Sequence, residues 1–374
     1  MTLPDSDPAK WFYPEHTAVK HRILDGYLRT WISIRGSTSD NLGYIDGFAG
    51  RGVYSDGSDG SPIIAMKAAQ QLIDKIQRKT TGLKKFICYF VEKDEDNYRC
   101  LKDQVEKLKP NCKDVTCNLR NETFEEFTKE FSELSKNNGP IPTLFFIDPF
   151  GWDGVPFEAI KGILDNQNTE ILLTFMVKDM NRFLTSPFHR DSLNKLYGNS
   201  CWEECLKTSS GRENALVNTY LRCITEETKA KFVLPFQLYE SEVRRPKYYL
   251  IFVTHHPFGL RKMKDIMKNA GSGDFGFKGP DHQTSITQQK LPVFEEMQIK
   301  HILKLYAGKR IRFDKFLDEV YPQIEDQIIG ALIESDYRAL IKKMELEGRI
   351  EIERKKPGSR AINYEIMLSF PDSQ

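Results

Sequence analysis

The sequence predicts an α/β fold with an open, mainly parallel sheet, followed by a smaller domain of helices and a β-hairpin. Short apolar runs alternate with helix-forming segments between residues 42 and 175, as parallel strands and their crossover helices do. A glycine-rich turn follows the first apolar run, and acidic residues follow the first, second and fourth runs. We therefore expect a first domain at 1–270, a linker or active-site loop at 271–292, and a second domain at 293–374.

Length and composition are those of a globular protein. The chain has 374 residues, 40% of them hydrophobic, which is enough for two packed domains. The net charge of +1 means that any basic surface is local. No apolar run is long enough for a membrane span, and the N-terminus, with Asp5 and Asp7, lacks the apolar core of a signal peptide. Seven scattered cysteines are typical of a reducing compartment, so we expect a cytoplasmic protein without a membrane partner or a metal site.

Seven segments have the apolar character of buried strands. They lie at Leu42–Ile45, Lys85–Val91, Asp114–Cys117, Thr143–Ile147, Glu170–Phe175, Phe232–Leu238 and Tyr248–Thr254. An amphipathic helix at Trp11–Ile34, which carries Lys20, precedes the first of them. The basic residues Arg244, Arg245 and Lys247 are expected in a turn between the last two strands, where they could contact phosphate. A solvated hairpin tip is the alternative.

A turn rich in glycine follows the first strand. Asp46 ends the strand, and Gly47, Gly50 and Gly52 allow backbone angles that other residues resist and leave room for a ligand against the main chain. A helix is expected to begin at Ser61–Pro62, because Ser is a good N-cap and Pro a good first residue. Strand, turn and helix together predict the cofactor-binding corner of an open α/β sheet.

Glu92 stands at the carboxyl end of the second strand. Its two oxygens are able to accept hydrogen bonds from both ribose hydroxyls of a nucleoside cofactor. The simpler alternative is that Glu92 only caps the helix that follows, because acidic residues favour helix N-termini.

The fourth strand leads to Asp148-Pro149-Phe150-Gly151-Trp152. This segment resembles the Asp/Asn-Pro-Pro-aromatic motif of amino methyltransferases, with Phe150 and Gly151 in place of the second Pro and the aromatic residue. The resemblance implies that the Asp148 carboxylate and the Pro149 carbonyl would each accept an N–H of an exocyclic amine, which would aim the nitrogen lone pair at a methyl donor. Phe150 or Trp152 would stack on the base. An Asp-Pro turn that only closes the strand is the alternative.

Two of these motifs resemble known sequences. The pattern D-x-F-x-G-x-G, formed by Asp46, Phe48, Gly50 and Gly52, resembles motif I of S-adenosylmethionine-dependent methyltransferases, especially those acting on exocyclic amino groups. The D-P-F-G segment is similar to motif IV of the tRNA guanosine N2-dimethyltransferases, and the likeness covers this motif only.

Together with Lys20-His21, V-E-K-D and Y-Y-L-I-F-V-T-H-H-P, these motifs look like the three-Cys-motif partner family over Thr17 to Met267. The resemblance implies a Rossmann-like class I methyltransferase sheet and S-adenosylmethionine as cofactor. It also implies a partner protein with a cysteine motif, similar to radical S-adenosylmethionine enzymes. The implied cofactor contacts are Lys20 at the methionine carboxylate, Asp46, Phe48, Gly50 and Gly52 at the methionine part, Glu92 at the ribose and Asn121, with Asn118 as the alternative, at the adenine amino group. A solvated Lys20 on the helix face is the alternative to its contact with the carboxylate.

The second domain is expected to be a winged helix. Helices are predicted at Glu295–Tyr306, Phe313–Val320 and Glu334–Glu347, with strands at Arg349–Glu353 and Ala361–Met367. Its basic residues suit phosphate contact, and they are Arg338, Lys342, Lys343, Arg354, Lys355, Lys356 and Arg360. The acidic residues Glu334, Asp336 and Glu345 lie among them, which leaves a protein-binding winged helix open.

The predicted function is S-adenosylmethionine-dependent N-methylation of an exocyclic amino group of a nucleic acid base, with RNA favoured over DNA. Asp148, Pro149, Phe150 and Trp152 would form the catalytic group. The missing second Pro keeps a rival open, a non-catalytic methyltransferase-fold subunit that binds nucleic acid and the cysteine-motif partner. A weaker rival is a metal-dependent nuclease using Asp46, Glu92 and Asp148.

Overall fold

A computed structural model describes residues 13–77, 82–138, 141–208, 210–240, 243–271, 276–277, 292–324, 326, 328–355 and 361–372. The chain divides into two compact units, the first formed by Met1–His255 with Phe277–Gly279 and the second by His256–Gly276 with Pro280–Gln374. This division places helix α9 (Pro257–Ala270) in the second unit, whereas the sequence-based bounds place it in the first domain. Most of the expected linker at 271–292 lies outside the described residues.

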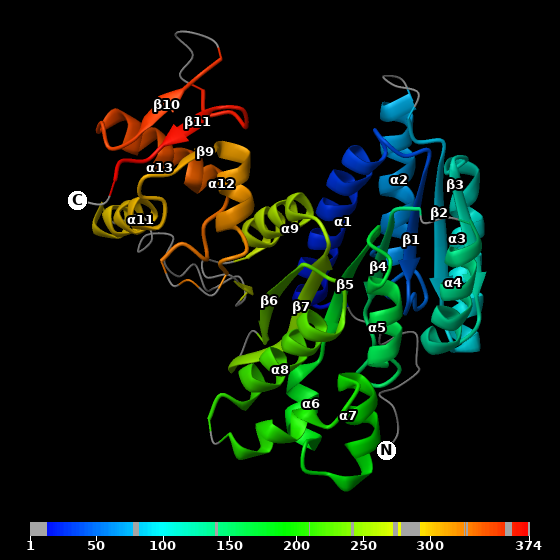
Figure 1. The fold of residues 1–374 in the computed structure, drawn as a ribbon. Coiled ribbons are helices and arrows are strands. Elements are labelled where there is room, and N and C mark those ends of the chain that lie inside the picture. Colours follow the sequence, from blue (N-terminus) through cyan, green and yellow to red (C-terminus); the bar gives the residue numbers. More distant parts are fainter. Residues whose placement is uncertain are drawn as a thin grey trace. The chain divides into compact units, whose positions relative to one another are not determined.

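One mixed sheet forms the centre of the first unit (Figure 1). Its strands are β1 (Asn41–Asp46), β2 (Lys85–Val91), β3 (Val115–Arg120), β4 (Thr143–Ile147), β5 (Thr169–Phe175), β6 (Phe232–Glu240), β7 (Val243–Thr254) and the two-residue β8 (Gly276–Phe277). The strand order is β3-β2-β1-β4-β5-β7-β6-β8. Strands β1 to β5 run parallel, and β7 runs antiparallel to both β5 and β6. The predicted Rossmann-like α/β fold class is therefore confirmed.

The sheet register brings the expected site residues to one edge. Asp46 of β1 pairs with Phe90 of β2 and Phe146 of β4. Glu92 and Asp148 each follow these partners by two residues, so all three acids lie at the carboxyl ends of neighbouring strands.

Strand β7 is longer than predicted, and this corrects one expectation. Arg244, Arg245 and Lys247 were expected in a turn, but they belong to β7, which pairs with β6 up to Val243. The connection between β6 and β7 is therefore shorter than the apolar pattern indicates, because the basic residues continue the strand.

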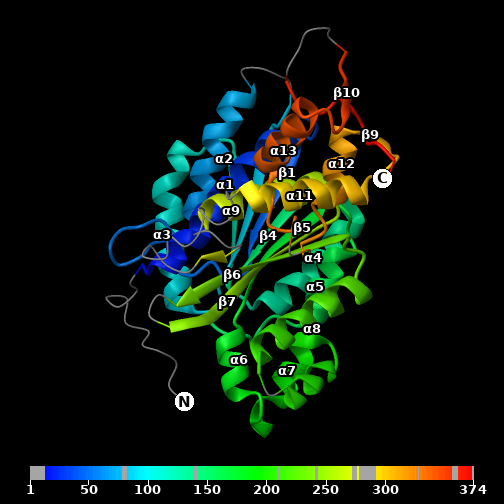
Figure 2. The same ribbon diagram turned by 90° about the vertical axis from the view of Figure 1, so that its left-hand side faces the viewer.

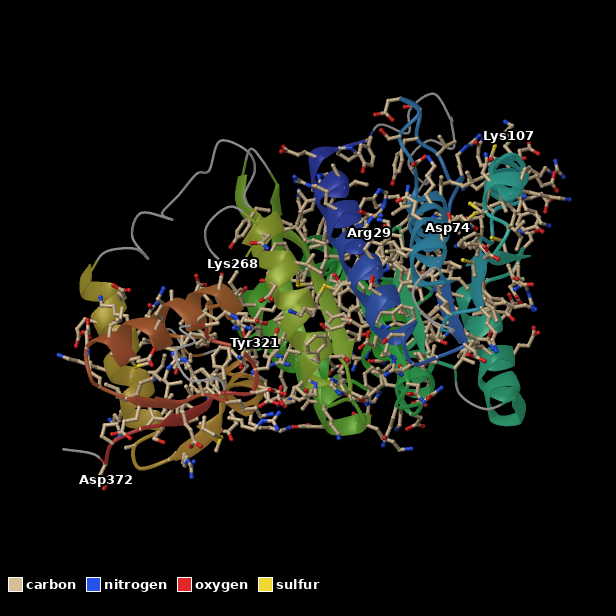
Figure 3. All side chains as sticks on the ribbon, turned by 90° about the horizontal axis from the view of Figure 1, so that it is seen from above. Arg29, Asp74, Lys107, Lys268, Tyr321 and Asp372 are labelled. Atoms are coloured by element: carbon tan, nitrogen blue, oxygen red, sulfur yellow. The ribbon has the colours of Figure 1, made fainter. Side chains whose placement is uncertain are left out.

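Helices cover both faces of the sheet. They are α1 (Glu15–Arg35), α2 (Ser61–Gln77), α3 (Glu95–Leu108), α4 (Phe124–Asn138), α5 (Phe157–Leu164), α6 (Val177–Phe183), α7 (Arg190–Tyr197) and α8 (Arg212–Glu227), with 3-10 turns η2 (Lys109–Asn111), η3 (Pro187–His189) and η4 (Cys201–Lys207). Helices α1 and α2 lie side by side on one face, where Arg29 donates to the Gln71 side chain across 2.8 Å; Figure 3 labels Arg29 on α1 and Asp74 on α2. Residues of α5, α6, α7 and α8 bury the opposite face in a large apolar core.

The segment from α6 to α7 follows β5 and lies beyond the carboxyl ends of β4 and β5 in both Figure 1 and Figure 2. It therefore stands beside the edge of the sheet that holds the acidic residues. None of the described helices is both long and apolar enough to cross a membrane.

The second unit has its own core and a small antiparallel sheet. Its elements are α9 (Pro257–Ala270), α11 (Pro292–Leu305), β9 (Arg310–Arg312), α12 (Phe313–Val320), α13 (Glu334–Leu346), β10 (Glu351–Glu353) and β11 (Met367–Ser369), with strand order β10-β11-β9. Phe316, Tyr337 and Leu368 are buried in its core. Tyr321, labelled in Figure 3, donates to the Asp265 carboxylate of α9 across 2.6 Å.

Two details of this unit differ from the sequence-based expectation. The last strand lies at Met367–Ser369 and not at Ala361–Met367, and β9, which pairs with it, was not predicted. Strand β9 is only three residues long and reads Arg-Ile-Arg, which gives too short an alternation to be recognised in the sequence.

Candidate cofactor and acceptor site

Asp46 is a fully buried acid at the end of β1. Burial raises the pKa of its carboxyl to about 7, although hydrogen bonds from Ser61, the Phe48 N–H and the Tyr44 hydroxyl favour the charged form. The Asp148 carboxylate raises the pKa further. A buried carboxyl that is this costly to ionise is suited to receive a cation.

The glycines of the turn are required by close backbone packing. Gly52 has φ of +76°, and a Cβ at Gly60 would lie 2.9 Å from the Gly52 carbonyl carbon. The Gly60 N–H donates to the Gly52 carbonyl across 2.8 Å, which closes the loop before α2. A Cβ at Gly47 would lie 2.6 Å from the Phe124 ring, and Phe48 packs on that same ring at 5.5 Å between centroids. Any larger residue would shift the turn, so its conformation is specified by the sequence.

Glu92 joins this turn to the start of α3. Its Oε2 accepts the Gly50 N–H at 2.9 Å, and its Oε1 accepts the Asp94 N–H at 2.8 Å. Burial raises the pKa of Glu92, while these two hydrogen bonds favour its charged form. The N-cap of α3 is Asp94, which accepts the Asn97 N–H at 2.9 Å, so Glu92 is not the residue that caps the helix. Each carboxylate oxygen keeps a second lone pair, which suits a pair of hydroxyls.

Asn121 lies just after β3, next to Glu92. Its side-chain amide N–H groups donate to the backbone carbonyls of Glu92, at 2.9 Å, and Lys93, at 3.3 Å. The amide oxygen is therefore on the opposite side of the group, where it presents an acceptor of the kind that an adenine amino group requires.

Lys20 and Asp148, for which separate roles were predicted, form an ion pair. The Lys20 side chain is 7% exposed and the Asp148 side chain 19% exposed. The Lys20 ammonium also lies 5.6 Å from the centre of the Tyr248 ring. Helix α1 therefore brings a buried cation to the carboxyl end of β4. Lys20, which was predicted to contact a cofactor, thus contacts Asp148, which was predicted to contact the acceptor.

Three rings pack beside this ion pair. The Tyr13 hydroxyl lies 3.2 Å from His21 Nδ1, and the Tyr54 ring centre lies 4.8 Å from that of Tyr13 and 5.8 Å from that of His21. Burial and the Lys20 charge lower the pKa of His21 to about 3, so its ring is neutral. Sequence reasoning missed Tyr13, Tyr54 and Tyr248, because they come from three separate segments with no motif of their own.

The acceptor residues after β4 differ in exposure. Pro149 is buried, whereas the Phe150 side chain is 74% exposed. Trp152 donates from Nε1 to Ser192 Oγ at 3.1 Å, and its ring contacts those of Phe183 and His189. A small hollow lies beside Trp152, and its walls include Pro149, Trp152, Phe175 and Met176. Of the two rings that were predicted to stack on a base, Phe150 is the more exposed.

The basic residues expected to contact phosphate are mostly engaged in ion pairs. In the second unit the pairs are Arg338–Glu334, Lys343–Glu295, Arg354–Glu345 and Lys355–Glu365. Lys342 is exposed on α13. In the first unit, Lys247 Nζ lies 2.9 Å from His16 Nε2. The side chains of Arg244 and Arg245, and all of Lys356 and Arg360, lie outside the described residues.

Within the described part of the chain, no three His, Cys, Asp or Glu side chains are grouped so that they could hold a metal ion. Asp46, Glu92 and Asp148 therefore do not form one such group there, so this geometry lends no support to the metal-dependent nuclease.

The strand order, with β7 reversed between β5 and β6, defines a Rossmann-like class I methyltransferase fold.

No protein-family model matches the chain, and no curated protein matches it. Among solved structures, a precorrin-6y C5,15-methyltransferase from Geobacter metallireducens is 11% identical, with 66% of this chain and 91% of that chain covered and a TM-score of 0.30. TYW2 of P. horikoshii in complex with MeSAdo is 13% identical, with 66% of this chain and 64% of that chain covered and a TM-score of 0.28. Such distant likenesses assign no activity to this chain, and the fold class rests on its own strand order.

Proposed function

We propose that this chain is an S-adenosylmethionine-dependent N-methyltransferase that acts on an exocyclic amino group of a nucleic acid base, with RNA favoured over DNA. The observation that supports this most is the meeting of two motifs at one sheet edge. The glycine turn with Asp46 and the Asp148-Pro149 segment end the neighbouring strands β1 and β4, and Lys20 contacts Asp148 between them.

The residues present fit the cofactor. Asp46 would face the methionine ammonium, because a buried carboxyl with a pKa near 7 gains most from a cation. Glu92 would accept the ribose hydroxyls and the Asn121 amide oxygen the adenine amino group. When bound, S-adenosylmethionine supplies an electrophilic methyl group. The chain's contribution is to hold that group in line with the acceptor.

Asp148 and Pro149 would act on the acceptor. The Asp148 carboxylate and the Pro149 carbonyl would each accept one N–H of the amine, which withdraws its lone pair from the ring and aims it at the methyl carbon. Asp148 would then take the proton that the nitrogen loses as the new C–N bond forms. Phe150 would stack on the base and fix its plane.

The first experiment is a calorimetric titration with S-adenosylmethionine. We expect micromolar binding by the parent and at least tenfold weaker binding by Glu92→Ala, because two hydroxyl contacts and the tie to the Gly50 N–H are lost. Glu106→Ala, which changes an exposed acid of α3, should bind as the parent does. Absence of binding by the parent would contradict the cofactor proposal.

Lys20 is expected to contact the methionine carboxylate. Lys20→Gln should weaken S-adenosylmethionine binding about tenfold, because a charge-assisted hydrogen bond is lost. Decarboxylated S-adenosylmethionine lacks the group that Lys20 would bind, so the parent and the variant should bind it equally. If the variant loses both ligands to the same extent, Lys20 has no specific contact with the carboxylate.

A non-catalytic subunit is the second candidate. The observation that favours it is the ion pair itself, because Lys20 already neutralises the carboxylate that would act on the amine. In this alternative the chain would bind nucleic acid and a cysteine-motif partner protein.

We also propose that the second unit is a winged helix. The order α11-β9-α12-α13-β10-β11, with β11 between β9 and β10, supports this. Helix α13 would be the recognition helix. Its exposed surface includes Ser335, Ala339, Lys342 and Leu346, a mixture that suits contact with protein as well as with phosphate.

A further inference from the structure

Phe188 is the feature of the first unit that the proposed function leaves unexplained. It lies in the turn η3 and its side chain is 92% exposed. A ring so fully in solvent is a large apolar group that another molecule can contact. Phe150, at 74% exposed, is the other outward-facing Phe of this unit among the described residues.

The turn that carries Phe188 is fixed by hydrogen bonds. Trp152 Nε1 donates to Ser192 Oγ at 3.1 Å, and Ser192 Oγ donates to the His189 carbonyl at 3.1 Å. The His189 N–H donates to the Ser186 carbonyl, also at 3.1 Å. These bonds hold the backbone on both sides of Phe188, so the ring is presented outward by a structured turn.

Ring contacts and buried leucines also fix the turn that carries Phe188. The His189 ring centre lies 5.4 Å from that of Trp152 and 5.1 Å from that of Phe183. Leu184 and Leu193, on either side of the turn, are buried. The exposure of Phe188 is thus built into the fold, and a pre-organised ring loses little entropy when it binds.

The contact between His189 and Trp152 also links the turn of Phe188 to the segment that carries Asp148 and Phe150. Phe150 precedes Trp152 by two residues, and Phe188 precedes His189, whose ring touches Trp152. The two exposed Phe residues are therefore close neighbours in sequence of two rings, Trp152 and His189, that contact each other after the carboxyl end of β4.

Positive and negative side chains are mixed around the rings, so they would attract the phosphates of a nucleic acid strand only modestly. Arg182 is exposed and its guanidinium lies 5.1 Å from the Phe183 ring centre, and Lys195 is exposed on α7. Asp179 and Asp191 are exposed in the same segment, so the positive field is weak. Aromatic rings beside a few cations are the combination by which proteins bind unpaired bases.

We propose that Phe188 and Phe150 form a stacking platform for two unpaired bases of a single-stranded nucleic acid. The target base lies on Phe150, and a neighbouring base of the same strand lies on Phe188. This rests on the proposed function and narrows its substrate to single-stranded segments, because paired bases have no free face to offer two separate rings.

The test is fluorescence anisotropy with a labelled oligoadenylate of about 12 nucleotides, compared with an abasic oligomer of the same length. Phe188→Ala should weaken oligoadenylate binding about tenfold and leave the abasic oligomer unaffected, since stacking is lost and the phosphates are unchanged. Phe188→Trp should restore binding. Phe188→Leu should not, because it keeps an apolar side chain without a π face.

Leu206→Ala, at a partly exposed apolar residue of η4, is the matched control and should bind as the parent does. Equal binding by the parent and Phe188→Ala would overturn the platform while leaving the proposed function intact. Full recovery with Phe188→Leu would overturn stacking in favour of an apolar contact. A parent that binds S-adenosylmethionine in calorimetry but neither oligomer would overturn both the platform and the nucleic acid target.

Discussion

Replacing Asp148 by Asn should lower the rate of methyl transfer by about 10²–10³-fold, because Asn keeps an acceptor oxygen but lacks the negative charge that holds the amine N–H groups and takes up the proton, in a site where water is largely excluded. Binding of S-adenosylmethionine should be retained, since the expected cofactor contacts of Asp46, Glu92 and Asn121 remain in place. The measurement is transfer of a labelled methyl group from the cofactor to an RNA pool at saturating cofactor, with calorimetry on the same preparation.

Asp153→Asn is the matched control, since Asp153 is an exposed aspartate of the same loop. It should transfer methyl groups at the parental rate. If Asp148→Asn is as active as the parent, Asp148 does not act on the amine. If the parent binds the cofactor and the RNA but transfers nothing, the non-catalytic subunit becomes the better account of the chain.

Replacing Asp46 by Asn should raise the free energy of unfolding of the first unit at pH 8, and this gain should be much smaller at pH 4. The pKa of Asp46 is about 7 in the folded protein because of burial, against an ordinary value near 4 in the unfolded chain. A raised pKa means that the folded state binds the proton more tightly. The stabilisation from that proton is complete below about pH 4 and is lost as the pH rises towards 7.

The folded and unfolded pKa values of Asp46 differ by about three units, which corresponds to about 4 kcal/mol of unfolding free energy gained by the variant at pH 8. This is an upper value, because the changed hydrogen bonds of the Asn side chain are not counted. Urea unfolding followed by tryptophan fluorescence reports on the first unit alone, because Trp11, Trp31, Trp152 and Trp202 all lie within it. Asp103→Asn, at an exposed acid of α3, should show no such gain with pH. A constant difference between parent and Asp46→Asn from pH 4 to 8 would mean that Asp46 does not titrate in this range.

The same substitution should impair cofactor binding, because an amide does not balance the methionine ammonium. In the parent, the cation favours the charged carboxylate, so affinity should fall as the pH drops below about 7. Greater stability combined with weaker binding would identify Asp46 as a residue retained for binding at a cost in stability.

The sheet and its acidic strand ends could be predicted because their signals are local. Apolar runs bounded by turn residues mark the strands, and β4 lies at the predicted residues Thr143–Ile147. The Lys20–Asp148 pair could not be predicted, because its partners lie 128 residues apart and meet only through the packing of α1. The engagement of Trp152 by Ser192 escaped prediction for the same reason.

The second unit shows a similar limit. The Arg338–Glu334 pair follows from helical spacing and could be predicted from the sequence. The pairs Lys343–Glu295 and Arg354–Glu345 join different elements, so their basic residues were expected to be available to phosphate. A list of basic residues is therefore a poor guide to a nucleic acid interface unless the acidic neighbours in space are known.

These ion pairs mean that the second unit supplies its own counterions. A phosphate that approaches Arg338 or Lys343 meets a cation that a carboxylate of the protein already neutralises, so few of the cations condensed on the nucleic acid would be released. Electrostatic affinity gained in this way is small. Nucleic acid binding through these paired residues of the second unit would then depend mainly on contacts with bases and would change little with salt concentration.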